Sequence, residues 1–292
     1  MNQKIFCYCI CLLGCLSCVE DINLDEKHER QVVVNCALHS GPAQILTLTY
    51  SNPLGKFYYD EVEQAVVTLF EDNQPVGQFT KNGFMQWKLE FTPTEGRAYK
   101  LKVDVPGEPV ITASTTMPPR VCVSQVKRGG LDEPIYFRQN KTANSCYVFI
   151  INNYGDEVVV DPIVYPHNEL ADQIGTNHPC VDQFNMEEAS DIGDTTPAFL
   201  SYLRISNEVK DVDWPVEFCV DGSLQQSMLF FRAASKEYDR YLKTSLQKML
   251  VYEAFDDPSQ WFDENVVYSN ITNGLGIFAA YNDKVFNYTI PE

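Results

Sequence analysis

The chain has 292 residues, of which 45% are hydrophobic and 12% aromatic, and its formal net charge at pH 7 is −18. This composition can form packed cores and differs from that of disordered chains. The excess of 40 acidic over 22 basic residues argues against nucleic acid as a partner, because nucleic acid needs basic patches. It also argues against electrostatic attachment to anionic lipid.

The first predicted element is a short apolar run from Ile5 to Leu16, preceded by a single cation, Lys4. A helix that spans a bilayer needs about 20 apolar residues, so this run has the length of a signal-peptide hydrophobic region instead. The run ends at a cysteine, and the sequence turns acidic at once with Glu20 and Asp21. This pattern predicts a bacterial lipoprotein, in which the signal peptide is removed and the new amino-terminal cysteine is acylated.

Two cysteines compete for the lipid anchor. Leu12 to Cys15 is the sharper generic lipobox, whereas Leu16 to Cys18 lies where the apolar run meets the acidic stretch. We favour Cys18, with Cys15 as the second choice; an uncleaved anchor and an ordinary cleaved signal stay open as alternatives. The predicted signal peptide then covers residues 1–17 and a polar tether covers residues 18–27. Multiple acyl chains, at about 0.8 kcal/mol per buried CH₂, hold such a protein stably on a membrane.

Residues 28–119 are predicted to form a domain of short strands. Apolar and polar residues alternate, for example from Tyr99 to Val105, and turn residues such as Glu71 to Pro75 separate the runs. Seven or so such strands predict an antiparallel β-sandwich of immunoglobulin-like or transthyretin-like type. Met117-Pro118-Pro119 is predicted to be a stiff linker after it, since consecutive prolines cannot continue a β-ladder. The predicted strands cover residues 31–38, 44–50, 62–71, 76–79, 85–91, 98–105 and 110–116.

Residues 120–292 are predicted to form a second, β-rich domain of α+β type with one main helix. Ser235 suits a helix N-cap, and apolar residues recur at helical spacing through residues 236–250. The segment from Pro166 to Pro197 has no clear period and predicts an extended loop; loops of this length are usually functional or mobile. Asn273-Gly274 predicts a tight turn. The predicted strands cover residues 121–127, 146–152, 157–165, 199–205, 228–233, 277–281 and 284–290.

Five cysteines follow the leader, and their odd number leaves at least one thiol unpaired. Cys36, Cys122 and Cys146 lie among β-branched and apolar residues, so we interpret them as buried free thiols. Cys180 and Cys219 lie in polar surroundings and are the best candidates for a disulfide, which an exported protein can form.

The strongest candidate for a metal site is weak. His178, Cys180 and Asp182, with His167 nearby, are of metal-ligand type, but the tight pairs typical of zinc sites are missing. An ordinary loop or a disulfide is the favoured interpretation, so we predict no metal and no cofactor. The sequence also lacks a nucleophile elbow, a metalloprotease motif and a phosphate loop. We therefore assign no catalytic residues and no ligand-binding residues.

Three stretches carry a resemblance to a known family. They are Ser17 to Asp25 at the anchor, the hairpin from Tyr99 to Pro118, and Tyr268 to Ile271 with Gly274 to Phe278. On these residues the chain resembles the exported Bacteroidota lipoproteins grouped as domain of unknown function 4249. The register of the first stretch supports Cys18 over Cys15. Asn23 departs from the acid of the family pattern, and the loop of residues 166–197 has no counterpart in it.

The resemblance implies an outer-membrane lipoprotein, often encoded beside a TonB-dependent transporter, and it carries no established catalytic residues. Glu20 and Asp21 resemble a surface-export signal, so the resemblance implies that the body faces the outside of the cell. The leading hypothesis is a surface- or periplasm-facing outer-membrane lipoprotein that serves as an accessory or ligand-binding subunit of a TonB-dependent nutrient uptake system. Its partners would be the membrane and the transporter. The alternative is a structural or adhesive envelope lipoprotein without a transport role, and the third hypothesis is an enzyme.

Overall fold

The structure is a computed structural model, and it describes residues 29–53, 60–127, 135–139, 144–152, 173–186, 197–206, 215–220, 226–253 and 266–289. The predicted leader and tether, with Cys15 and Cys18, lie outside these residues, as does the predicted strand of residues 157–165. The described chain is mainly β with one helix, as the sequence predicts. No helix in the described ranges is both long and apolar enough to cross a membrane.

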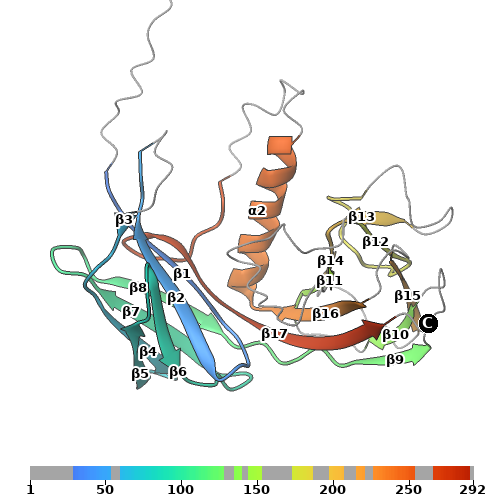
Figure 1. The fold of residues 1–292 in the computed structure, drawn as a ribbon, viewed down its shortest axis with the longest axis horizontal. Coiled ribbons are helices and arrows are strands. Elements are labelled where there is room, and N and C mark those ends of the chain that lie inside the picture. Colours follow the sequence, from blue (N-terminus) through green and yellow to red (C-terminus); the bar gives the residue numbers. More distant parts are fainter. Residues whose placement is uncertain are drawn as a thin grey trace, which may run out of the picture.

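The N-terminal strands form a β-sandwich that closes on itself (Figure 1). The strands follow one another in the order β17-β1-β2-β6-β5-β4-β7-β8, where β17 is Leu275–Thr289, and β3 pairs with β2. A bridge between Thr112 of β8 and Thr272, just before β17, joins the two ends of this row. The elements are β1 (Val32–Leu38), β2 (Ala43–Tyr50), β3 (Asp60–Glu61), β4 (Val66–Glu71), β5 (Gln74–Lys81), β6 (Gln86–Glu90), β7 (Ala98–Asp104) and β8 (Ile111–Thr116).

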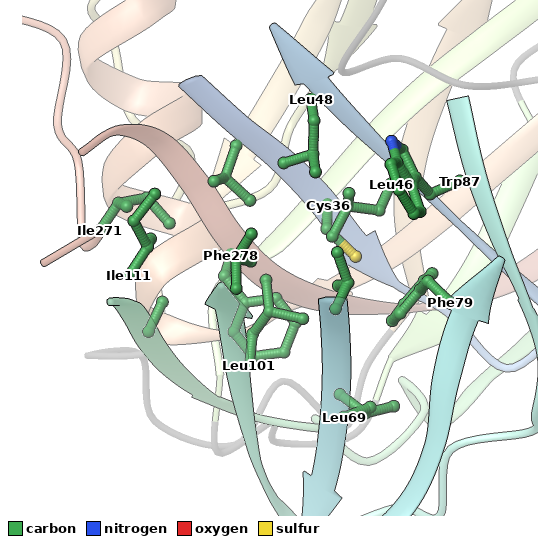
Figure 2. Packing of buried hydrophobic residues seen from close by; sticks show 14 of the residues in the cluster. Cys36, Leu46, Leu48, Leu69, Phe79, Trp87, Leu101, Ile111, Ile271 and Phe278 are labelled. Atoms are coloured by element: carbon green, nitrogen blue, oxygen red, sulfur yellow. The ribbon is translucent and has the colours of Figure 1, made fainter. Parts of the chain in front are cut away.

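The sandwich core follows from the alternation of its strands. In β1 every second residue is buried, as expected for a strand with one face on a core. Figure 2 shows the result around Phe278, with Cys36 and Leu101 inside the sandwich. Trp87 packs in the same core and is 5% exposed.

The C-terminal half has three layers. Strands β14, β11, β16 and the second part of β17 form its central sheet, a smaller sheet in the order β13-β12-β15-β10-β9 covers one face, and α2 covers the other. The elements are β9 (Val123–Lys127), β10 (Ile135–Gln139), β11 (Cys146–Asn152), β12 (Gln173–Thr176), β13 (Ala198–Leu200), β14 (Tyr202–Ile205), β15 (Pro215–Val220), β16 (Gln226–Ala234), α2 (Lys236–Glu253) and β17 (Leu275–Thr289).

Strand β17 belongs to both halves. Leu275 to Ala280 pair in parallel with β1, and Tyr281 to Thr289 pair antiparallel with β16. The sequence predicts two strands here, separated by Asn282 and Asp283, whereas the structure has a single strand. The polar pair is tolerated because both side chains are partnered: the Asn282 amide donates to Glu95 Oε1 at 2.8 Å, and Asp283 pairs with Arg232. Strand β17 thus completes the N-terminal sandwich. The predicted domain boundary at residue 119 does not include this contribution.

Polar contacts also hold the linker between the halves. Pro118 O accepts a hydrogen bond from the buried Asn282 amide at 3.2 Å, and Arg120 Nε donates to Asn282 Oδ1 at 3.3 Å. Thr115 Oγ1 of the sandwich lies 3.1 Å from Ser235 Oγ and 2.8 Å from Glu237 Oε2 at the start of α2. These contacts fix the second half on the sandwich at the same place where β17 passes from one to the other.

Helix α2 confirms the prediction for residues 236–250 and runs three residues further, to Glu253. Tyr238 N donates to Ser235 Oγ at 3.2 Å, which is the predicted N-cap. Tyr238 and Leu246 are buried on the helix face that the sequence pattern indicates. The predicted loop of residues 166–197 is partly regular: its described part includes β12, which pairs with β13 and β15.

Candidate functional site

Four polar side chains lie in one row across the central sheet of the C-terminal half. The strand registers place Arg204 of β14 beside Tyr147 of β11, Tyr147 beside Arg232 of β16, and Arg232 beside Asp283 of β17. Because neighbouring residues in a ladder share a face, the four side chains lie on the same side of the sheet. We call them the cross-strand row; the first turn of α2 covers it with Tyr238 and Asp239.

Arg232 is the most deeply buried charge of the row. Its side chain is 1% exposed, and its Nε and Nη2 donate to the two carboxylate oxygens of Asp283 at 2.8 and 2.7 Å. Nη1 donates to Tyr238 Oη at 2.7 Å, and the guanidinium lies 3.7 Å from the ring centre of Tyr281. Burial lowers the pKa of Arg232, but the interactions with Asp283, Tyr238 and Tyr281 together outweigh burial and hold the pKa well above its ordinary value. Arg232 therefore stays charged, as a bidentate, ring-stacked arginine does.

Arg204 makes the matching contacts at the other end of the row. Its Nε and Nη2 donate to the carboxylate of Asp239, both at 2.8 Å, and Nη1 donates to Asp182 Oδ2 at 3.0 Å. Lys243 Nζ of α2 donates to the same Asp182 oxygen at 3.0 Å. The hydrogen bond to Asp239 is the main cause that raises the pKa of Arg204, against the opposing effect of burial.

Tyr147 lies between the two arginines in the row and is itself a hydrogen-bond donor. Its hydroxyl donates to Asp239 Oδ1 at 2.9 Å, and burial, followed by the nearby Asp239 charge, raises its pKa well above the ordinary value. A proton on Tyr147 is thus held firmly at neutral pH. Every ionisable group of the row is matched by a partner of the row or of α2, an arrangement that fixes the helix on the sheet and leaves the charges engaged with one another.

The sequence contained a signal for this row. Arg232 is a lone cation in the apolar run from Met228 to Ala234, and a charge in such a run must find a partner when the strand is buried. The sequence pattern predicts the strand of residues 228–233 but assigns no role to Arg232. Its partners come from β17 and α2, and no local pattern specifies them.

The predicted disulfide is not formed in the structure, because Cys180 carries a free thiol. The register places Cys219 of β15 opposite Gly175, so the strand next to it carries no cysteine at the paired position. The side chain of Cys219 lies outside those described. Of the three cysteines predicted to be buried, Cys36 and Cys146 are, whereas Cys122 is exposed. Cys122 directly follows Val121 at the start of the second half, and only Val121 of this pair is buried.

Two of the three candidate metal ligands, His178 and Asp182, are engaged in other contacts. The Cys180 amide donates to His178 Nδ1 at 3.2 Å, so the ring proton is on Nε2 and that nitrogen has no lone pair for a metal. Burial lowers the pKa of His178 to about 4, which keeps the ring neutral. Asp182 is ion-paired with Arg204 and Lys243. Among the described residues no group of three His, Cys, Asp or Glu side chains could hold a metal ion.

Two solved structures match this chain at low sequence identity and low TM-score. A putative membrane-anchored protein from Corynebacterium diphtheriae is 10% identical with a TM-score of 0.21; the match covers 70% of this chain and 54% of that one. The chain thus spans about half the length of that protein. A structure of manganese lipoxygenase of Gaeumannomyces graminis with part of zonadhesin of Komagataella pastoris is 9% identical with a TM-score of 0.19, covering 89% and 96% of the two chains.

A search of curated proteins finds no match. A family model, in contrast, matches residues 19–286, which is nearly all of the chain that follows Cys18. The family is described as a domain of unknown function, DUF4249. The three stretches that suggested this family lie around Asp25 near the start of the match, in the hairpin of β7 and β8, and just before and within the first part of β17. The chain belongs to the DUF4249 family.

Proposed function

We propose that the protein is an outer-membrane lipoprotein, acylated on Cys18, that acts as an accessory or ligand-binding subunit of a TonB-dependent nutrient uptake system. The observation that carries the proposal is the apolar run of residues 5–16 that ends at Cys18 and turns at once into an acidic tether. In this proposal the body faces the outside of the cell. The family match that begins at residue 19 supports a body that starts directly behind the anchor.

The way the tether joins the fold suits an anchored protein. The tether continues into β1, and β1 is hydrogen-bonded on both sides, to β2 and to β17. A force on the tether is therefore borne by a central strand with two ladders rather than by an edge strand that can peel away. The N-terminal sandwich would then act as the stalk, with the C-terminal half attached to it through the same β17 that pairs with β1.

The buried charges of the cross-strand row have a structural role in the fold. In the cross-strand row each arginine is matched by carboxylates at 2.7 to 3.0 Å. The hydroxyl of Tyr147 donates to the Asp239 carboxylate, and the hydroxyl of Tyr238 accepts from Arg232. Catalysis needs an acid, base or nucleophile that can reach a substrate. The row fixes α2 on the sheet instead.

The anchor is tested by two matched variants, Cys18→Ala and Cys15→Ala, expressed in the native host. We expect Cys18→Ala to abolish incorporation of labelled palmitate and membrane retention, and Cys15→Ala to leave both intact. The opposite result would move the anchor to Cys15, and labelling of neither parent nor variant would contradict a lipoprotein.

The transport role is tested by purifying the C-terminally tagged protein from native membranes in mild detergent and identifying partners by mass spectrometry. A stoichiometric TonB-dependent barrel is the expected result. Recovery of an acylated protein without a barrel would refute the uptake role and support the structural or adhesive envelope lipoprotein, which would then be screened against glycans and matrix proteins.

A further inference from the structure

One end of the sandwich is defined by where the chain enters it. Strand directions follow from the registers: β1, β4, β6, β8 and β17 begin at this end, and β2, β5 and β7 finish there. We call it the tether-side rim; the strand ends that form it include Val32, Tyr50, Val66, Lys81, Asp104, Ile111 and Leu275. Figure 1 shows this end at β3, while β17 leaves the sandwich at the opposite rim to join the second half.

The exposed large apolar side chains of the sandwich gather at the tether-side rim. Phe84 is 65% exposed in the turn between β5 and β6, and Val66, Val110 and Leu275 are exposed by 42 to 50% at the strand ends. The remaining exposed large apolar residues among those described, Val126, Met186, Val266 and Val285, lie in other parts of the chain. Single exposed apolar residues are ordinary, but the gathering of four of them on one rim needs an explanation.

The turn that carries Phe84 is held in a fixed shape. Met85, the next residue, has a left-handed backbone with a φ of 58°, which is unfavourable for a side chain of its size. Its N–H donates to Glu61 Oε1 at 2.7 Å, and its carbonyl accepts from Leu48 N at 3.0 Å. Lys81 Nζ holds the same Glu61 oxygen at 3.0 Å. The surrounding contacts thus keep Phe84 directed outward despite the backbone cost.

The charges of the rim are largely paired. Arg30 lies 3.8 Å from Asp60, Lys81 lies 3.0 Å from Glu61, and Lys102 lies 2.7 Å from Asp104. Glu63 and Glu108 add negative charge to the rim. A surface with paired charges, some extra negative charge and protruding apolar groups fits a zwitterionic headgroup layer better than an anionic one.

The tether joins the body at this rim. From Cys18 to Glu29 the chain can span at most about 40 Å when fully extended. We propose that the tether-side rim lies against the lipid headgroups and that Phe84 inserts into the interface as a second, weak contact beside the acyl anchor. This inference rests on the proposed lipid anchor and adds an orientation: the sandwich stands with its tether-side rim on the bilayer, and β17 enters the second half at the opposite rim. An aromatic ring at the membrane interface is a favourable placement.

The test uses the acylated full chain, purified in detergent and reconstituted into phosphatidylcholine vesicles. Tryptophan is introduced by Phe84→Trp at the tether-side rim and by Gln74→Trp at the opposite rim, where Gln74 is also exposed. The fluorescence of each variant is compared with that of the parent protein in vesicles with and without brominated acyl chains. We expect a loss of the added fluorescence for Phe84→Trp and no loss for Gln74→Trp.

The possible outcomes separate the orientation from the anchor. Flotation of the parent with the vesicles, lost in Cys18→Ala, reports the anchor alone. If the parent floats but both added tryptophans keep their fluorescence, or both lose it equally, the orientation is wrong although the anchor holds. If contact at position 84 occurs only in native membranes that contain a transporter, a protein rather than lipid covers the rim, and the proposal is overturned. Thermal melting of both variants confirms that they fold.

Discussion

Ile277 and Phe278 are neighbours on β17, both fully buried, and their side chains lie in different cores. Ile277 packs with α2 and the central sheet, and Phe278 packs inside the sandwich (Figure 2). Successive residues of a strand point to opposite faces, so one strand can serve two cores. The two halves therefore share a structural element, and we expect them to unfold as one cooperative unit.

Phe278→Ala tests this coupling. Loss of a buried phenylalanine costs about 3–5 kcal/mol of unfolding free energy. Unfolding is followed in a Trp214→Phe, Trp261→Phe background, with Trp87 fluorescence reporting the sandwich and circular dichroism at 222 nm reporting α2. Both midpoints should fall together, while the exposed control Leu275→Ala should change stability by about 0.5 kcal/mol or less. A fall in the fluorescence midpoint alone would show that the halves unfold independently.

Gly276→Ala should be among the most destabilising single changes in β17. Gly276 has a φ of 101°, and an added Cβ would lie 2.1 Å from Val34 O of the paired strand β1. The matched control is Gly96→Ala, since Gly96 also has a positive φ, 78°, but open space at the Cβ position. We expect a cost of about 1–2 kcal/mol for Gly96→Ala and more than about 4 kcal/mol for Gly276→Ala.

Denaturant unfolding of the two variants measures this difference. Both variants carry the strain of a positive φ, so the excess for Gly276→Ala reports chiefly the clash with β1. Equal costs would mean that β1 and β17 can separate slightly without loss, and that the parallel ladder between them is loose.

The sandwich and the helix were predictable because their signals are local. A few consecutive residues specify the alternation in β1 and β7 and the Ser235 cap of α2. The structure contains each of these features. The turn at Asp72 and Asn73 was predicted for the same reason, and both residues have positive φ. Strand β17 was split in the prediction because Asn282 and Asp283 are polar, although both find partners far away in the sequence.

The cross-strand row was not predictable by the same reasoning. Arg204, Tyr147, Arg232 and Asp283 come from four strands, and only the register of three separate ladders brings them together. A register shift of one residue in any of these ladders would move one of the four side chains to the opposite face of the sheet. The sequence could identify Arg232 as a buried charge in need of a partner, but the partner depends on the fold.

Arg232→Met should destabilise the protein by about 3–5 kcal/mol, because Asp283 is left with an uncompensated, mostly buried charge. The control Arg97→Met breaks an exposed pair with Asp72, at 57% and 43% side-chain exposure, and should cost about 1 kcal/mol or less. Adding Asp283→Asn to Arg232→Met should recover part of the loss, since the carboxylate charge is removed. Similar costs for the two arginines in urea unfolding would show that the row contributes no more than a surface pair.

His178 should make stability depend on pH in a defined window. Its pKa is lowered by burial to about 4 in the folded protein, against an ordinary value of 6.5. Between these values the unfolded chain binds a proton that the folded protein does not, so the free energy of unfolding falls as the pH is lowered from 6.5 to 4. The loss amounts to about 3 kcal/mol over this range, and no contribution from His178 changes above pH 6.5.

The matched variant is His178→Gln, whose amide oxygen can still accept the Cys180 N–H but does not titrate. The free energy of unfolding in urea is measured for both proteins at half-unit steps from pH 4 to 7.5, and the difference between them is plotted. The neighbouring Asp182, whose pKa is lowered below 3.8 by Lys243 and Arg204 against the effect of burial, titrates at lower pH and cancels in the difference. We expect the difference to change between pH 4 and 6.5 and to be flat above. A constant difference would mean that His178 is protonated in the fold as readily as in the unfolded chain, and that its ring has access to water or to a carboxylate.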